Sequence, residues 1–138
     1  MDDRTRIGEY WLNIKLSDME TIDLVNEWFE RWENGEFMNL PLSEDFIHTS
    51  PYGTIEGKKA YIDLIVANID KFLGHRFEIH DAIYEKNKAC IRYTAIKENF
   101  SLDVSEWHYV QEGKIEKVVA YYNIEGEISE ERKLSLPD

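Results

Sequence analysis

Four consecutive segments in the second half of the chain constrain the fold more than any other feature of the sequence. Each is rich in Ile, Val, Tyr, Phe and Trp, and short polar turns separate one from the next. This pattern predicts long β-strands joined by tight hairpins, which together form an antiparallel meander. The predicted strands are residues 75–86, 88–98, 100–111 and 114–124.

Two amphipathic helices are predicted ahead of the meander. Over residues 17–32 apolar side chains recur at three- and four-residue spacing, and acidic residues fill much of the opposite face. Ser17 or Asp18 is the expected N-cap, and Gly35 is expected to end the helix. A second apolar stripe at helical spacing predicts another helix over residues 57–72.

The rest of the first half is predicted to be extended or irregular. Residues 10–16 alternate between apolar and other side chains, which favours a strand or an extended arm. Residues 37–45 are interpreted as a short connection and residues 46–49 as a brief strand. A turn follows at residues 50–53, because Pro51 disfavours a helical conformation at the residue before it.

Helices followed by a long antiparallel sheet define an α+β fold class. We expect the helices to pack in the concave face of a strongly curved antiparallel sheet, which gives a cone-shaped α+β barrel with a central pocket. At 138 residues the chain is interpreted as a single domain. Its core is expected to cover about residues 17–126, with an N-terminal arm over 1–16 and a tail over 127–138.

Charge and cysteine content exclude several kinds of partner. Acidic residues outnumber Lys and Arg by 28 to 16, and the sequence has no basic cluster, so we expect neither nucleic acid nor anionic membrane to bind. The single cysteine, Cys90, has no partner for an internal disulfide, and its apolar neighbours predict a buried strand position. Together with an N-terminus that lacks the apolar run of a signal peptide, this favours a cytoplasmic location.

Three local patterns resemble the nuclear transport factor 2-like superfamily, in its SnoaL-like and ketosteroid isomerase-like branch. They are the aromatic-rich first helix that ends in Asn34-Gly35-Glu36, the block HTSPYGTIEGKKAY at 48–61, and the closing EGKIEKVVAYYNIEG at 112–126. The resemblance covers about residues 17–126 and implies the cone-shaped fold. It implies no single activity, because the superfamily supports hydrolysis, isomerisation, cyclisation, transport and plain dimerisation on one scaffold.

The isomerase branch allows a sharper comparison. Its members use a carboxylate base followed by proline, and two proton donors, a helix tyrosine and a neutral strand aspartic acid. In this chain the three positions fall on Ser50, Trp28 and Glu106, and only Glu106 has a carboxyl group. Since a serine hydroxyl without a base does not take a proton from carbon at useful rates, the comparison argues against isomerase activity of that type.

Strand alternation selects the side chains that are expected to face the pocket. His48 and Ser50 share the face of the short strand that the resemblance places inward. Glu106 and His108 share the more apolar face of the third meander strand. The predicted ligand-binding residues are Trp28, Ser50, Tyr52, Tyr93 and Tyr122.

The inward polar residues predict an acid–base site. His48 is assigned as the base, Glu106 as the general acid or oxyanion donor, and His108 or Tyr93 as a supporting hydrogen-bond partner. Less specific interpretations stay open. Glu106 and His108 are also compatible with a solvated strand end, His48 with a structural histidine, and the aromatic residues with plain core packing.

The function that these features favour is the binding of a small hydrophobic molecule that carries a carbonyl or hydroxyl group. Any catalysis is expected to be cofactor-independent acid–base chemistry of the isomerase, cyclase or hydrolase type. The four histidines lack the spacing of a metal site, so neither a metal nor a cofactor is expected. The alternative is a non-catalytic ligand-binding or dimerisation module.

The opposite face of the meander predicts a partner of its own. Trp107, Tyr109, Val119 and Tyr121 are expected to form an outward apolar patch, which is larger than a monomer usually exposes. Because related folds commonly dimerise through this face, we expect a homodimer.

Overall fold

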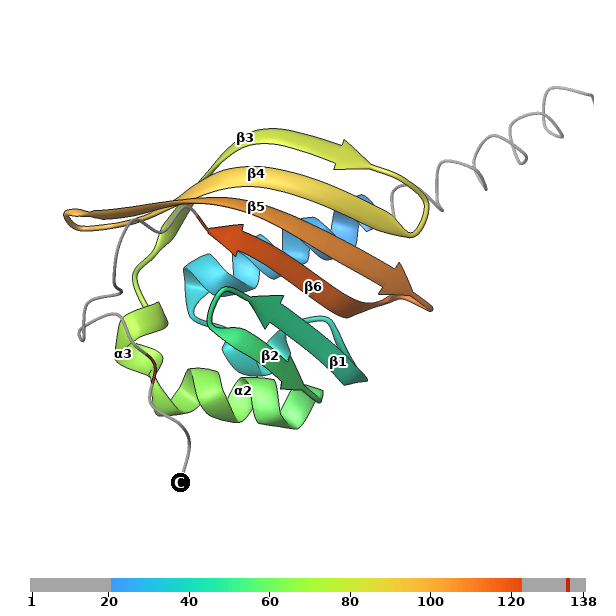
Figure 1. Ribbon diagram of the computed structural model, residues 1–138, viewed down its shortest axis with the longest axis horizontal. Helices are drawn as coiled ribbons and strands as arrows, with labels where there is room; N and C mark the ends of the chain where they lie inside the picture. The colour runs from blue at the N-terminus through green and yellow to red at the C-terminus, as the bar shows by residue number, and fades with distance from the viewer. Residues whose placement is uncertain (1–20, 123–133, 135–138) are drawn as a thin grey trace, which may run out of the picture.

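The computed structural model describes residues 21–122 and residue 134. Residues 21–34 are helical, and we refer to them as the first helix. The other elements, shown in Figure 1, are η1 (Phe37–Asn39), β1 (Leu42–Ser50), β2 (Gly53–Glu56), α2 (Lys58–Ala67), α3 (Ile69–Phe72), β3 (Arg76–Tyr84), β4 (Lys88–Lys97), β5 (Phe100–Gln111) and β6 (Lys114–Tyr122). The predicted arm, the N-cap at Ser17 or Asp18, and the predicted tail apart from residue 134 lie outside the described residues.

The strands form one curved sheet with the order β2-β1-β6-β5-β4-β3. Strands β3 to β6 pair antiparallel in sequence order, which confirms the predicted meander. The sheet curves over the first helix, drawn in blue in Figure 1, and α2 lies beside β1 and β2. From α3, at the end of α2, the chain continues to β3. The α+β class is therefore confirmed, although the sheet ends at β2 and β3 and does not close into a barrel.

The prediction for the first half of the sheet was incomplete. The brief strand expected over 46–49 is the nine-residue strand β1, which begins at Leu42 inside the predicted connection. The turn after Ser50 leads into β2, a strand that was not predicted, because four residues are too few to show alternation. Moreover, β1 pairs with β6 in parallel, so the sheet is not purely antiparallel.

The helix predicted over 57–72 is interrupted at Asn68. This residue is buried, and its side-chain Nδ2 donates a hydrogen bond of 2.8 Å to the carbonyl oxygen of Leu64. Its backbone N–H bonds to Ile65 at 3.0 Å, which ends α2, and α3 then starts in a new direction. An asparagine that satisfies backbone groups locally competes with helix continuation.

The predicted end of the first helix at Gly35 is confirmed, since Gly35 has a φ of 72°.

The first helix provides the centre of the hydrophobic core. Val25, Trp28, Phe29 and Trp32 are all buried against the inner face of the sheet. Their spacing of three and four residues places them on one side of the helix, as the sequence pattern predicted. Alternate residues of the strands pack against this side of the helix. Along β4, β5 and β6, most inner positions are therefore buried, and the outer positions are exposed or half-buried.

Cys90 does not occupy the buried position predicted for it. It lies on β4 between Ala89 and Ile91, which are both buried, and alternation therefore turns Cys90 to the outer face, where it is half-buried. The strand prediction was correct and the burial prediction was wrong.

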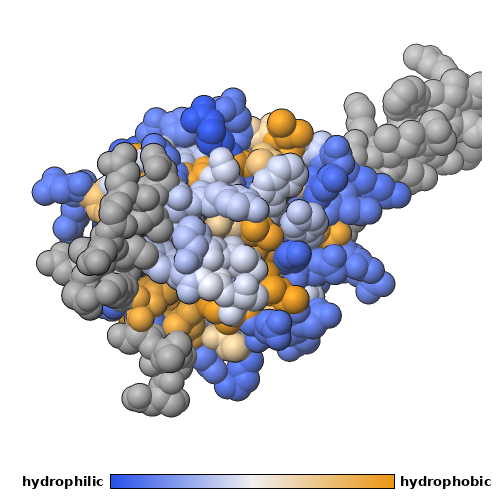
Figure 2. Space-filling view, in the orientation of Figure 1, coloured by the Kyte–Doolittle hydropathy of each residue, from blue (hydrophilic) through white to orange (hydrophobic). Residues whose placement is uncertain are grey.

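Apolar side chains also reach the surface of the helical layer. Figure 2 shows apolar residues over α2 and α3, where Val66, Ile69 and Leu73 are each at least 40% exposed. Scattered exposed residues of this kind are ordinary for a small domain. None of the helices in the described part of the chain is long and apolar enough to cross a membrane.

The contrast between two neighbouring residues of β4 tests the inner and outer faces of the sheet. We expect Ile91→Ala to lower the free energy of unfolding by about 2–5 kcal/mol, because Ile91 is fully buried and its truncation leaves a cavity. Cys90→Ala should cost less than about 1 kcal/mol, because Cys90 is on the outer face. Chemical denaturation followed by tryptophan fluorescence measures both values, and equal costs would contradict the assignment of faces.

Candidate functional site

The helices and the sheet enclose a cavity of about 490 Å³. Every helix and strand among the described residues except η1 contributes to its wall, and Leu134 from the C-terminal segment also lines it. The wall is mostly apolar and aromatic. Small-molecule sites typically have volumes of about 300–1,000 Å³ with apolar walls and a few polar groups. The cavity therefore has the size and composition of a ligand site.

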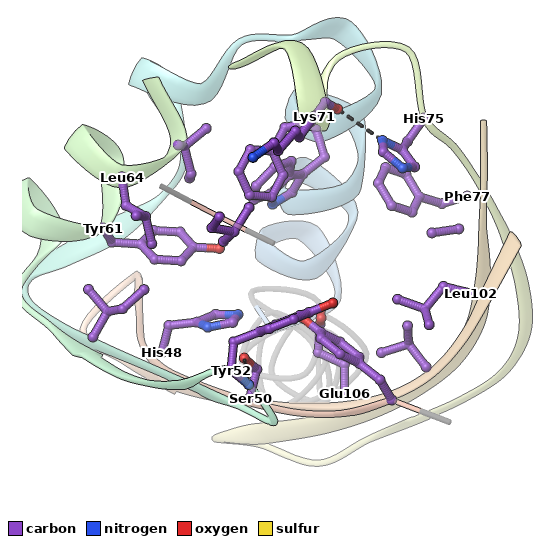
Figure 3. A pocket seen from close by; sticks show the side chains of 18 of the residues that line it. His48, Ser50, Tyr52, Tyr61, Leu64, Lys71, His75, Phe77, Leu102 and Glu106 are labelled. Carbon is purple, nitrogen blue, oxygen red and sulfur yellow. Dashed lines mark hydrogen bonds between the residues drawn. The ribbon is translucent and has the colours of Figure 1, made fainter. Parts of the chain in front are cut away.

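The structure brings most of the predicted site residues to this cavity. His48 and Glu106 line it, whereas His108 is fully buried and lies behind the wall. The predicted ligand-binding residues all line the cavity: Trp28, Ser50, Tyr52, Tyr93 and Tyr122. In Figure 3, His48, Ser50 and Glu106 lie along one side of the cavity, and His75 and Phe77 lie across from them.

The sheet register explains how residues from distant segments meet. His48 on β1 pairs with Val118 on β6, and Val118 pairs with His108 on β5. The two histidines therefore belong to one row across three strands, about 10 Å apart at the backbone, since neighbouring strands lie about 4.8 Å apart. Glu106 is two residues along β5 from His108, so both side chains point to the same face of the sheet.

Glu106 is the only carboxylate among the described residues that is buried. Its side chain is held by two neighbours: the Tyr93 hydroxyl donates a hydrogen bond of 2.7 Å to Oε2, and Nε2 of His108 lies 2.9 Å from Oε1. The His108 contact has the distance of an ion pair, but the ring N–H is not aligned with the oxygen as in a good hydrogen bond. The interpretation of Glu106 and His108 as a solvated strand end is wrong, because they are 3% and 0% exposed.

These contacts determine the protonation of Glu106. Burial raises the pKa of Glu106, but the contact with His108 and the hydrogen bond from Tyr93 together lower it by more. The pKa therefore lies below its ordinary value of 4.5, and the group is a carboxylate at neutral pH. This direction does not fit the predicted role of Glu106 as a general acid or neutral oxyanion donor.

His48 is shifted in a way that keeps it neutral. Burial in the cavity wall lowers the pKa of His48 from 6.5 to about 4, and the negative charge of Glu106 offsets only part of this effect. The ring stacks on Tyr61, with centroids 4.8 Å apart and an interplanar angle of 27°. At neutral pH, His48 therefore presents one N–H donor and one unprotonated nitrogen.

Three tyrosines of the cavity wall are kept as neutral phenols. Burial, together with the charge of Glu106, raises the pKa values of Tyr61, Tyr93 and Tyr122. Each of these hydroxyls therefore keeps its proton at neutral pH, and Tyr93 already donates its proton to Glu106.

Some cavity residues were missed by the sequence analysis. Thr54 and Ile55 belong to β2, which was not predicted, and Phe77 on β3 had no signal beyond its apolar character. Tyr61 belongs to the apolar stripe of the helix predicted over residues 57–72, and to the block HTSPYGTIEGKKAY. Neither pattern distinguishes a tyrosine of the core from a tyrosine whose hydroxyl reaches a cavity.

Within residues 21–122, no group of three or more His, Cys, Asp and Glu side chains is placed to hold a metal ion. The polar groups of the cavity are one carboxylate, imidazoles, hydroxyls and Lys71 at α3. They are suited to hydrogen bonding and proton transfer.

The fold and the cavity together define a small α+β protein with a pocket. Comparison with known families then assigns the chain to one family within this class. The model of the SnoaL-like domain matches residues 25–118, well over half of the chain. The chain belongs to this family, within the nuclear transport factor 2-like superfamily, as the sequence patterns implied. Among curated protein sequences no match is found.

Solved structures with the same fold carry varied names. An NTF2-like protein of unknown function from Burkholderia xenovorans has a TM-score of 0.69 and 15% identity over 85% of this chain and 93% of its own. A candidate ketosteroid isomerase from Kribbella flavida has a TM-score of 0.67 and 14% identity, covering 81% and 84%. An LEH-like epoxide hydrolase from M. tuberculosis has a TM-score of 0.63 and 18% identity, covering 77% and 84%. At these identities the likeness shows the fold alone.

The lowered pKa of His48 predicts a specific pH dependence of stability. As the pH falls below 6.5, the unfolded chain takes up a proton at this residue, and the folded protein does so only near pH 4. The free energy of unfolding must therefore decrease across this window, by up to about 3 kcal/mol. Glu106, whose pKa is lowered from 4.5, adds to the acid sensitivity only below that value.

Urea unfolding at pH 7, 5.5 and 4.5 tests this dependence. We expect His48→Gln to remove much of the loss of stability between pH 6.5 and 4.5, because the substituted side chain does not titrate. The exposed histidine His80 provides the control, and His80→Gln should keep the wild-type slope. A slope that is unchanged in His48→Gln would contradict a neutral, buried His48.

Proposed function

We propose that the cavity binds a small, mostly apolar molecule with a carbonyl or hydroxyl group and moves a proton on it without a cofactor. The observation that carries this proposal is that a neutral imidazole, His48, and a buried carboxylate, Glu106, both line one aromatic cavity, where the carboxylate acts on the imidazole through its charge. Apolar walls supply binding energy, and the few polar groups orient the reacting part of the ligand.

The protonation states suggest how the roles are divided. His48 is the group that accepts the proton, since its ring lines the cavity and is unprotonated at neutral pH. The negative charge of Glu106 favours the imidazolium that forms, as a fixed carboxylate does in a catalytic triad. His108 and Tyr93 hold this carboxylate in place, and Tyr122 is a neutral donor for the oxygen of the ligand.

A non-catalytic ligand-binding role is the second candidate, and one observation favours it. A general base works best when its pKa lies near the operating pH, whereas the pKa of His48 is about 4. A ligand that fills the cavity changes the surroundings of this ring. The pKa of His48 in the complex therefore decides between proton transfer and binding alone. Binding without proton transfer is the behaviour that this second candidate predicts.

Exchange of an acidic C–H proton separates the two candidates without knowledge of the natural substrate. 2-Tetralone, a bicyclic ketone, fits the proposed ligand class, and its α-protons exchange with D2O at a rate that NMR measures. We expect the wild-type protein to accelerate this exchange beyond buffer, and His48→Gln to reduce the protein-dependent rate about 100-fold or more. Glu106→Gln should also reduce the rate, because it removes the charge that favours the imidazolium.

The surface variant His80→Gln is the control for this experiment and should exchange at the wild-type rate. Binding of 2-tetralone is measured in parallel by calorimetry. Binding with no exchange above buffer would support the non-catalytic candidate. Exchange that persists in both His48→Gln and Glu106→Gln would contradict the proposed roles.

We also propose that the protein is a homodimer through the outer face of β5 and β6. The outer patch, defined as Trp107, Tyr109, Val119 and Tyr121, surrounds a shallow groove, and Trp107 and Tyr121 are 38% and 60% exposed. Lys117 reaches over the Tyr109 ring at 5.5 Å from its centroid. A contiguous aromatic patch of this kind favours burial against a second copy.

Sedimentation velocity at micromolar concentration tests the dimer. We expect the wild-type protein to sediment as a dimer and Tyr121→Lys to shift it to monomer, because a charge is then placed inside the contact. Val66→Lys is the matched control, since Val66 is 47% exposed but lies on helix α2, in the helical layer and not on the outer face of the sheet. A monomeric wild-type protein would rule out this part of the proposal.

A further inference from the structure

Tyr61 is a polar residue of the cavity that the proposed mechanism does not use. It is 5% exposed and comes from α2, on the helical side of the cavity. Its ring stacks on His48 at 4.8 Å and lies nearly parallel to Trp28, with centroids 6.3 Å apart and an angle of 16°. In Figure 3 the Tyr61 hydroxyl and the His48 ring both project into the same cavity.

The Tyr61 hydroxyl differs from the other buried hydroxyls of the wall in having no protein partner. Tyr93 donates to Glu106, and Tyr122 interacts with Ser50. Among the residues that the structure describes, neither Tyr61 nor the His48 ring has a hydrogen bond. Neither the Tyr61 hydroxyl nor a His48 nitrogen is among the fully buried polar atoms without a partner, and both residues line the cavity. Their polar atoms therefore remain accessible to a molecule that enters it.

The two unpaired groups complement each other chemically. Tyr61 has an O–H that donates, and burial together with the charges nearby keeps it protonated. Neutral His48 has one nitrogen that accepts. A hydroxyl oxygen satisfies both at once, because it accepts from Tyr61 through a lone pair and donates its own proton to His48.

We propose that Tyr61 and His48 form a two-point binding site for one neutral hydroxyl group of the ligand. This inference rests on the proposed function and specifies its ligand class as alcohols, phenols and the enol forms of ketones, each with an apolar body. A carboxylate is disfavoured at the same place, because the Glu106 carboxylate also lines the cavity and repels a second negative charge. Tyr61 is then a residue that contacts the ligand directly.

A series of three bicyclic probes tests the site by calorimetry. Naphthalene has no polar group, 2-methoxynaphthalene only accepts a hydrogen bond, and 2-naphthol both accepts and donates. For the wild-type protein we expect affinity to rise in that order. Tyr61→Phe removes the hydroxyl alone and should weaken 2-naphthol and 2-methoxynaphthalene about three- to tenfold, while naphthalene binding stays the same.

The control variant is Tyr84→Phe, which removes a hydroxyl from a residue of β3 that does not line the cavity and should change none of the three affinities. Naphthalene binding to Tyr61→Phe also reports that the cavity is intact. Equal affinities for the three probes, or an equal loss for all three in Tyr61→Phe, would overturn this inference and leave the proposed function standing. Failure of every probe to bind the wild-type protein would overturn both.

Discussion

The arrangement of the cavity depends on one physical constraint, which is that the buried carboxylate of Glu106 must be compensated by its neighbours. A buried charge is tolerated only when neighbouring groups compensate for the water it has lost, and removing one member of such a pair typically costs about 3–5 kcal/mol. Here His108 and Tyr93 supply that compensation. The position of His108 depends in turn on the first helix. Its ring packs against Trp28 and Phe29, at centroid distances of 5.4 and 6.1 Å.

Burial and the charge of Glu106 together set the protonation states of the cavity. Burial is the largest cause of the raised pKa values of the tyrosines and of the lowered pKa of His48; the charge of Glu106 adds to the first effect and opposes the second. The result is a cavity in which the carboxylate is ionised, the imidazole is neutral and the phenols remain protonated. Donors and acceptors are therefore fixed before a ligand enters, which is the preorganisation that binding and proton transfer both require.

Much of the fold follows from local patterns in the sequence. The meander was predictable because each strand carries its own alternation, and this alternation also placed Glu106 on the inner face. For His48 and Ser50, alternation indicated only a shared face, and the resemblance to the family placed that face inward. Elements that lack such a local signal were missed. β2 is too short to alternate, and the parallel pairing of β1 with β6 joins segments more than sixty residues apart, which no local pattern reports.

The site was predictable in its residues more than in its chemistry. Alternation identifies which side of a strand Glu106 faces, but its protonation depends on distances to His108 and Tyr93 that exist only in the folded protein. The same applies to Tyr61, because the apolar spacing of its helix is identical for a core residue and for a residue whose hydroxyl reaches a cavity. Likewise, the break at Asn68 depends on a buried side chain that bonds its own backbone.

The proposed roles of the cavity residues depend on the ionisation of Glu106, and the ¹³C chemical shift of its side-chain carboxyl measures this ionisation directly. Glutamate labelled at Cδ gives one signal for each carboxyl group, and the signal that disappears in Glu106→Gln belongs to this residue. We expect a carboxylate shift at pH 7 and a titration midpoint below 4.5. A shift of the protonated acid at pH 7 would contradict an ionised Glu106. The residue would then be a neutral hydrogen-bond donor, and the cavity would lack the negative charge that favours a protonated His48.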